Sequence, residues 1–465
     1  MNGPDDFCEV AQQVKSHTVQ TSDITRLGPG SAKLVRVAGV IGVVGLGAAI
    51  ASGLVSAGGY RRFLFAYLVA FCFCLTIALG ALIFVLLQHL TRAGWSVTVR
   101  RPAEAIAATL PVLGLLSLPI LFSVASADGA LYRWALPVGQ VGAEEPSSHV
   151  AASPHKSPST TAGEAVVRAA DSDPAQLAKP VLDSLILRKR AWLNPAFWIV
   201  RVVGYFAIWS LIARWYRAQS AVQDRTGDAA VSTRMQWWAP LAIIATGLTV
   251  TLAAFDLVMS LDPHWYSTIF GVYFLAGSFV ASFAALIVAV FALRTAGFVR
   301  SSLSTEHFHD LGKYLFAFVF FWGYIAFSQF MLLWYANIPE ETRWFARHGA
   351  TTVQADISGW SFVILAILFG HLLIPFAGLL SRHIKRSVGI LVFWAVWLLA
   401  FHYLDLYWVI LPEAGGDLNV HLADVAALVG VLGVFVAAAV RLLACENLIP
   451  TADPRLHEAL AFHNI

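Results

Sequence analysis

Ten long apolar runs constrain this chain more than any other feature. A membrane-spanning helix needs roughly 20 apolar residues, and the chain has such runs at residues 34–57, 63–87, 103–125, 196–216, 237–259, 266–293, 311–336, 359–380, 388–411 and 421–444. Because a bilayer leaves open backbone groups unpaired, and none of the runs alternates as a barrel strand does, we predict an all-α polytopic membrane protein with about ten transmembrane helices. The composition, 58% hydrophobic and 13% charged, excludes a soluble domain.

Basic residues gather in alternate connections between the runs. Arginine or lysine side chains follow the second, fourth, sixth and eighth runs, whereas the connections after the fifth and ninth runs contain neither. Arg61, Arg62, Arg343 and Arg347 oppose this pattern. The positive-inside rule still predicts that both termini are cytoplasmic and that the odd-numbered connections face the periplasm or exterior.

The chain divides into five segments. Residues 1–33 and 445–465 are predicted cytoplasmic tails, and the spans occupy residues 34–125 and 196–444. Residues 126–195 form one long polar insert, whose middle is rich in Ala, Ser, Pro and Thr, so we predict a largely disordered periplasmic segment. The insert ends in an amphipathic interfacial helix, where Arg188, Lys189 and Arg190 are expected to face lipid headgroups.

Motifs for a resident redox centre are lacking in the sequence. Four cysteines are present, without a CxxCH sequence or the cysteine set of an iron–sulfur cluster. We therefore predict no metal site and no covalently bound cofactor. A non-covalent haem between His371 and His402 is the alternative. The small net charge of +3 gives no indication of a nucleic-acid partner.

Polar residues gather near the outward ends of the fourth to sixth runs. The turn between the fifth and sixth runs contains Asp256, Asp262 and His264. Arg201 lies at a similar depth in the fourth run, where it either pairs with Asp256 or reaches the interface unaided. Asp262 has the alternative role of capping the following helix.

Further polar side chains lie within the later runs. Ionisable residues inside a bilayer are costly and indicate a functional role. Together with the outward group, they are our candidates for a proton path or for the surroundings of a quinone. These candidates are Tyr324, Ser328 and Gln329, expected to be buried in the seventh run, His371 in the eighth, and His402 and Asp405 at a similar depth in the ninth. Tyr273 in the sixth run is expected to donate a hydrogen bond inside the bundle.

A second polar group lies at the predicted cytoplasmic ends of the third and seventh runs. Glu104, His309, Asp310 and Lys313 are candidates for proton uptake there. Glu104 and Asp310 have the simpler alternative of stabilising helix N-termini. Two sets of titratable residues, one near each end of the spans and separated by a less polar middle of the helices, fit the hypothesis of two proton half-channels.

Three segments carry a family resemblance: SLDPHWYSTIFGVYF, DLGKYLFAFVFFWGYIAFSQFMLLWYANIPEETRW and RKRAWLNPAFW. They resemble the F subunits of bacterial alternative complex III, a quinol:cytochrome c (or other periplasmic acceptor) oxidoreductase, within the polysulfide-reductase membrane-subunit (NrfD-like) family. The resemblance implies two four-helix bundles plus two flanking helices in the bacterial inner membrane. The residues that match its motifs are Asp256, Asp262 and His264 in the turn, and Tyr324, Ser328 and Gln329 in the seventh run.

The resemblance also implies partners and cofactors. The partners would be a related NrfD-like membrane subunit together with multihaem cytochrome and iron–sulfur subunits, which carry the haem and the clusters. A quinone or menaquinone would bind in this chain or in its sister subunit. Our leading hypothesis is an integral subunit of a quinol-oxidising respiratory complex that contributes proton half-channels. A stand-alone secondary transporter or proton channel, and a purely structural scaffold subunit, are the alternatives.

Overall fold

The computed structural model describes residues 25–55, 58–136, 185–350 and 357–463. Within these ranges the chain is helical and contains no β-strand. Ten helical stretches are long and apolar enough to cross a membrane, at positions that match the ten predicted runs. Eight of them are α2 (Gly30–Val55), α3 (Gly59–Leu90), α9 (Pro195–Thr226), α10 (Ala229–Leu257), α11 (Phe270–Thr295), α12 (Thr305–Ala336), α17 (Val388–Ile410) and α18 (Leu422–Ala444). The prediction of a polytopic all-α membrane protein is confirmed.

Two of the ten stretches are broken. The third consists of α4 (Val97–Ala107), α5 (Leu110–Leu116) and α6 (Leu118–Ala125), and Pro111 and Pro119 lie in the first turns of the last two pieces. The eighth consists of α14 (Gly359–Ile367), a π-helical segment (Leu368–Leu373) and α15 (Ile374–Leu380). Pro375 has no amide proton to donate to the carbonyl of His371, four residues earlier, so the backbone departs from α-helical register there.

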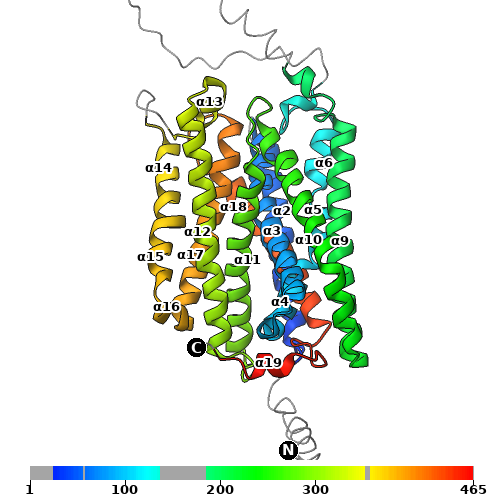
Figure 1. The fold of residues 1–465 in the computed structure, drawn as a ribbon. Coiled ribbons are helices and arrows are strands. Elements are labelled where there is room, and N and C mark those ends of the chain that lie inside the picture. The colour runs from blue at the N-terminus through cyan, green and yellow to red at the C-terminus, as the bar shows by residue number, and fades with distance from the viewer. Residues whose placement is uncertain (1–24, 56–57, 137–184, 351–356, 464–465) are drawn as a thin grey trace, which may run out of the picture.

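The helices form two four-helix bundles and a flanking pair (Figure 1). The first bundle contains α3, the broken α4–α6 stretch, α9 and α10. The second contains α11, α12, the broken α14–α15 stretch and α17. The flanking helices α2 and α18 pack along each other and against α3. This is the arrangement that we expected.

The first helices of the two bundles, α3 and α11, cross at the centre of the molecule. The most apolar part of α3 is entirely buried. At the crossing, a Cβ atom added to Gly80 would lie 2.2 Å from the carbonyl oxygen of Ser278 in α11. Only a glycine therefore allows the two backbones to approach this closely, and the contact holds the two bundles together.

A glycine seam joins α2 to α18, and it consists of Gly42 and Gly45 facing Gly433 and Gly430. A Cβ atom at Gly42 would lie 2.6 Å from the backbone nitrogen of Val434, and one at Gly45 would lie 2.6 Å from that of Gly430. The glycine-rich first span thus brings another helix close to its backbone.

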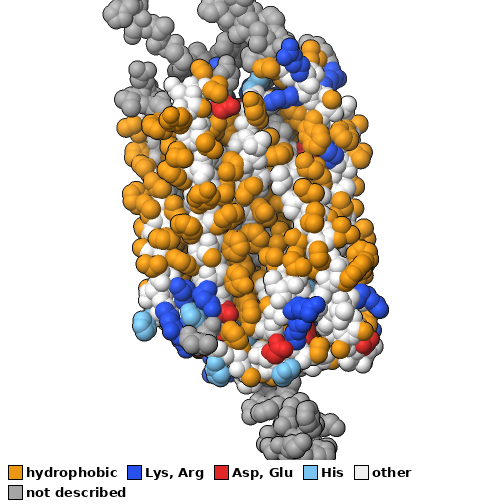
Figure 2. Space-filling view, in the orientation of Figure 1, with side chains coloured by type: hydrophobic (Ala, Val, Ile, Leu, Met, Phe, Trp, Pro, Cys, Tyr) orange, Lys and Arg blue, Asp and Glu red, His pale blue; other side chains and the backbone are white. Residues whose placement is uncertain are grey.

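Both ends of the described chain lie at the same end of the bundle (Figure 1). The backbone amide of Leu448 donates to the carbonyl of Thr25, 2.7 Å away, which ties the two terminal segments together. We call this the N/C end, and the opposite end, which carries α13 (Pro339–Arg347), the α13 end. Figure 2 shows hydrophobic side chains over the flank and charged side chains gathered near the two ends. Which end faces the cytoplasm remains a prediction from the loop charges.

Part of the polar insert lies outside the described residues. The expected disorder of residues 137–184, and most of the predicted N-terminal tail, fall in that part of the chain. Residues 185–189 are helical, at the place of the predicted interfacial helix. Lys189 does not face the headgroups there, because its Nζ donates to the carbonyl of Pro263 at 2.5 Å and lies over the ring of Tyr266.

Candidate functional site

Asp405 is a buried carboxylate inside the second bundle. It lies on α17, five residues before the helix ends at Ile410, or about 8 Å at 1.5 Å per residue. Its side chain accepts a hydrogen bond from the hydroxyl of Tyr273 on α11, as expected of that tyrosine. Among the described residues no arginine, lysine or histidine lies within ion-pair distance of Asp405. A charge on Asp405 would therefore lack a counter-ion in a dehydrated interior.

His402 lies one turn below Asp405 on the same helix and is 1% exposed. Its Nε2 lies 3.0 Å from the hydroxyl of Thr76 on α3. Thr76 donates its own proton to the carbonyl of Phe73, so its oxygen is left to accept from His402. This assigns the proton to Nε2 in the neutral ring and leaves a lone pair on Nδ1, which has no partner among the described residues.

His371 lies in the π-helical segment and is fully buried. Neither of its ring nitrogens has a hydrogen-bond partner in the described part of the chain. The ring of Trp322 on α12 packs on it with centroids 4.0 Å apart, and the ring of His402 lies 6.0 Å away. The expectation that the two histidines share a depth is confirmed, and three of their four nitrogens are buried without partners.

We call these residues the second-bundle cluster; it consists of Tyr273, Trp322, His371, His402 and Asp405 of the second bundle, together with Thr76 of α3, which contacts them from the first bundle. The sequence indicated the histidines, Tyr273 and Asp405. It gave no indication of Thr76 or Trp322, because a threonine that bonds its own helix and a tryptophan in an apolar run are ordinary features of membrane helices.

The alternative of a haem between the two histidines does not fit this geometry. Nε2 of His402 is engaged by Thr76, and a Cβ atom at Gly277 of α11 would lie only 2.9 Å from Cε1 of His402. The face of His371 is covered by Trp322. The rings are therefore enclosed by helices where a porphyrin would have to lie.

A second buried carboxylate, Asp256 at the end of α10, has a different environment. Arg201 on α9 binds it through two hydrogen bonds, from Nη2 at 2.7 Å and from Nε at 2.9 Å. Tyr205 and the indole of Trp192 donate to the same carboxylate at 2.8 and 3.0 Å. Of the two readings of Arg201, pairing with Asp256 is confirmed. Four donors and the guanidinium of Arg201 satisfy the oxygens of Asp256, an arrangement that suits a structural role better than proton exchange.

Asp262 shapes the turn that joins the two bundles at the α13 end. Its Oδ1 accepts from the amide of His264 at 2.9 Å, and its Oδ2 accepts from Arg347 of α13 at 3.2 Å. Burial opposes the charge, but the hydrogen bonds of His264 and the positive charge of Arg347 prevail and lower the pKa of Asp262 to about 2. The prediction that Asp262 caps the next helix is wrong, because α11 begins only at Phe270.

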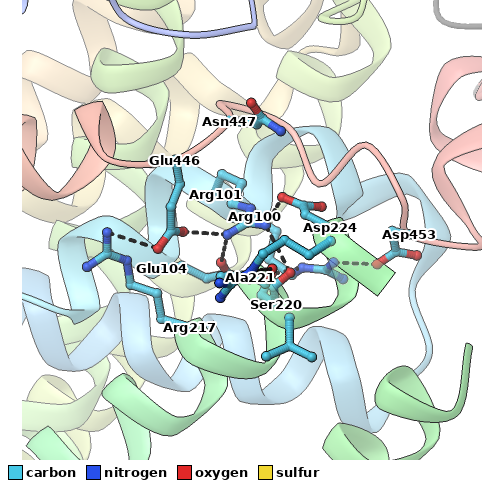
Figure 3. A network of polar contacts seen from close by, with 12 residues as sticks. Arg100, Arg101, Glu104, Arg217, Ser220, Ala221, Asp224, Glu446, Asn447 and Asp453 are labelled. Carbon is cyan, nitrogen blue, oxygen red and sulfur yellow. Dashed lines mark hydrogen bonds and ion pairs between the residues drawn. The ribbon is translucent and has the colours of Figure 1, made fainter. Parts of the chain in front are cut away.

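The N/C end contains a buried cluster that we call the arginine cluster (Figure 3). Glu104 lies between Arg100 and Arg101 of the same helix, with nitrogen–oxygen distances of 3.3 and 3.4 Å. The other ion pairs of the cluster are Arg100–Asp453, Arg101–Asp224, Arg101–Glu446 and Arg217–Glu446. It thus joins α4 and α9 to the segment after α18.

Charge balance gives this cluster a capacity for protons. Three arginines face four carboxylates, so one carboxylate can take up a proton and still leave an anion for each arginine. This supports Glu104 as a candidate for proton uptake. The alternative of N-terminal stabilisation is wrong for Glu104, because α4 begins seven residues earlier, at Val97.

The other three uptake candidates lie near the start of α12. Asp310 pairs with Lys313 at 2.5 Å, and His309 lies 3.9 Å from Glu306, which also binds Arg386. The capping role expected of Asp310 is wrong, because the N-cap of α12 is Ser304, six residues earlier.

The polar residues of the seventh span do not form the buried group that we expected. Tyr324 is 59% exposed on the outer surface of α12, and Ser328 is half-buried. Gln329 alone is buried, and its Oε1 accepts a hydrogen bond from Ser267 at 3.3 Å. The error arose because the span is apolar on all sides, so the sequence did not show which face is turned outward.

The fold and the buried cluster define a polytopic α-helical membrane protein with ionisable side chains inside its spans. Comparison with protein-family models gave no match, and comparison with curated proteins gave none either. Among the described residues no group of three or more histidine, cysteine, aspartate or glutamate side chains is placed to hold a metal ion.

Proposed function

We propose that this chain is an integral membrane subunit of a respiratory quinol:acceptor oxidoreductase, and that it transfers protons through the second-bundle cluster. The observation that supports the proton role is Asp405, a membrane-buried carboxylate that is bonded to a tyrosine and has no cation partner in the described part of the chain. The two adjacent histidines, with three unpartnered nitrogens, extend the set of groups that can give or take a proton.

Buried polar atoms that lack a hydrogen-bond partner indicate a place for an internal water molecule or for a proton that moves between groups. A buried donor or acceptor without a partner costs about 1–3 kcal/mol, and an internal water commonly supplies the missing bond. Water between His371 and His402 would complete their hydrogen bonding and link the two rings. A neutral imidazole has one donor and one acceptor nitrogen, so protons could pass from ring to ring and on toward Asp405.

Proton uptake belongs, in this proposal, to the N/C end. Glu104 in the arginine cluster and the α12 group of His309, Asp310 and Lys313 would collect protons there. Release would occur at the α13 end, about 8 Å from Asp405 along α17.

A driving reaction is required for such transport. Moving one charge against the membrane potential costs about 2.3 kcal/mol per 100 mV. Quinol oxidation in a complex would supply this energy, and the sequence resemblance supports membership of such a complex. The electron carriers would then lie in partner subunits, and a quinone in this chain or in its sister subunit.

The test compares two isosteric substitutions in the purified complex, reconstituted in vesicles with a pH-sensitive dye. Asp405→Asn is expected to slow proton translocation by about tenfold or more, because it removes a proton-transfer group. The matched change Asp256→Asn is expected to lower the yield of folded complex instead, because it leaves Arg201 buried without a counter-ion. Unchanged proton translocation in Asp405→Asn would leave the scaffold as the better account.

A stand-alone transporter is the second candidate, supported by the same buried groups. Purification in mild detergent distinguishes the two. Co-purification with haem-containing and iron–sulfur subunits supports the complex, whereas a solitary chain that translocates protons in vesicles without added quinol would contradict it.

A further inference from the structure

A groove lies at the α13 end between the last turns of α12 and the short helix α13. Its volume is about 240 Å³. It is lined by Phe330, Trp334, Pro339, Thr342, Arg343, Phe345, Ala346 and Ala350. The groove lies on the outer side of the second bundle, away from the second-bundle cluster.

A reversal of the chain builds the groove. Helix α12 ends at Ala336, and Asn337 adopts a left-handed conformation with φ of 49°, which turns the chain into α13. The rings of Phe330 and Phe345 then meet edge to face, with centroids 5.5 Å apart, and form an apolar floor. The walls are therefore aromatic and come from two helices that the turn holds together.

Arg343 provides the one charge of the lining. It is exposed, and no carboxylate among the described residues pairs with it. Arg347, one turn later on α13, differs from Arg343 because it binds Asp262 and Glu413. The groove thus joins an apolar floor to a cation that has no carboxylate partner among the described residues.

The groove continues onto a lipid-facing surface. Below it, the outward face of α12 exposes Phe327 and Met331, and its last turns expose Trp334 and Tyr335. Tryptophan and tyrosine are enriched at the boundary between hydrocarbon and headgroups. With Trp334 and Tyr335 at this boundary, Arg343 would lie near the lipid phosphates and the aromatic floor near the first acyl carbons.

We propose that this groove binds one phospholipid with an anionic headgroup, such as phosphatidylglycerol. The headgroup phosphate would pair with Arg343, and the start of an acyl chain would pack on Phe330 and Phe345. The apolar floor favours a lipid over a free phosphate ion, because an ion would make no use of it. The proposal stands independently of the function proposed above.

The test uses photo-crosslinking of the whole protein in nanodiscs, with lipids that carry a diazirine near the start of the acyl chain. Phosphatidylglycerol is expected to label the peptides of residues 330–350 several-fold more than phosphatidylcholine carrying the same chain. Arg343→Gln should reduce that labelling roughly fivefold, the scale of one basic side chain at an anionic membrane. Arg188→Gln, which removes an exposed arginine elsewhere in the described chain, should leave it unchanged.

Three results would overturn the proposal. Equal labelling by the two lipids would mean that the groove does not select a charge, and unchanged labelling in Arg343→Gln would mean that this arginine does not bind the headgroup. Excess inorganic phosphate serves as a competitor. Labelling should persist in its presence, and displacement by phosphate would point to an ion site instead. Because Arg343 is exposed, its substitution should preserve the fold, which size-exclusion chromatography checks.

Discussion

The two buried carboxylates show how the surroundings of a single residue decide its role. Asp256 and Asp405 both lie near the ends of spans, and the sequence treats them alike. In the structure Asp256 receives four hydrogen bonds and a guanidinium, whereas Asp405 bonds to a tyrosine without a cation. The sequence could place both carboxylates in the membrane. The difference between their surroundings depends on Arg201, which lies 55 residues from Asp256 in the chain.

The pH dependence of stability is predicted at Asp262. Its pKa is lowered from 3.8 to about 2, so its charged form stabilises the fold above about pH 4, and this contribution is lost as the pH falls through about 2. The contribution amounts to about 2 kcal/mol, at 1.36 kcal/mol per pKa unit. Asp262→Asn should lower the Tm in detergent between about pH 5 and 8, and the gap to the wild type should narrow below about pH 4. A gap that persists undiminished to about pH 2.5 would contradict this.

At the scale of the element, the two broken spans contain prolines at or beside their breaks, whereas α17, which carries His402 and Asp405, is a continuous helix. The glycines of the first span predicted a close neighbour, but their spacing did not say that the neighbour is α18. The π-helical segment around His371 was not predicted, because the run of residues 359–380 is continuously apolar and its single proline is compatible with an ordinary kink. A wider turn there carries His371 toward His402, and π-helical turns often mark functional sites.

The glycine seam makes a prediction about element packing. Gly430→Ala places a Cβ atom 2.6 Å from the backbone nitrogen of Leu46, so α2 and α18 must move apart. We expect a Tm several degrees below that of the wild type. Gly47→Ala is the control, because a Cβ atom there meets nothing within 4 Å and alanine is the better helix former. Equal Tm values for the two variants would mean that the seam contributes little.

For the whole molecule, the sequence predicted the number of spans and the shared side of the termini, because both follow from apolar length and parity. It did not predict the arginine cluster. Arg100 and Arg101 belong to the basic residues between the second and third runs that predict the topology, whereas the structure buries them against Asp224, Glu446 and Asp453. Those pairings join distant parts of the chain, and no local pattern of residues encodes them.

The orientation of the molecule is testable by cysteine labelling. The loop charges predict that the N/C end is cytoplasmic. Cys445 is exposed at that end, and Asp417→Cys would place a thiol on the connection after α17 at the other. In intact spheroplasts an impermeant maleimide should label the Asp417→Cys variant from which the other exposed thiols have been removed. In the protein without that substitution, the same reagent should not label Cys445. Labelling of Cys445 without labelling of the Asp417→Cys variant would mean that the N/C end faces outward, opposite to the prediction.

The arginine cluster also bears on how the protein is made. Arg101 and its partner Glu446 are separated by 345 residues. At about 5–20 residues per second, the ribosome adds the second roughly half a minute after the first. Until the segment after α18 is made, the three arginines of the cluster face only Glu104 and Asp224, so this end of the molecule cannot reach its final packing. Completion of this end of the molecule therefore cannot precede synthesis of the segment after α18, which is among the last parts of the chain to be made.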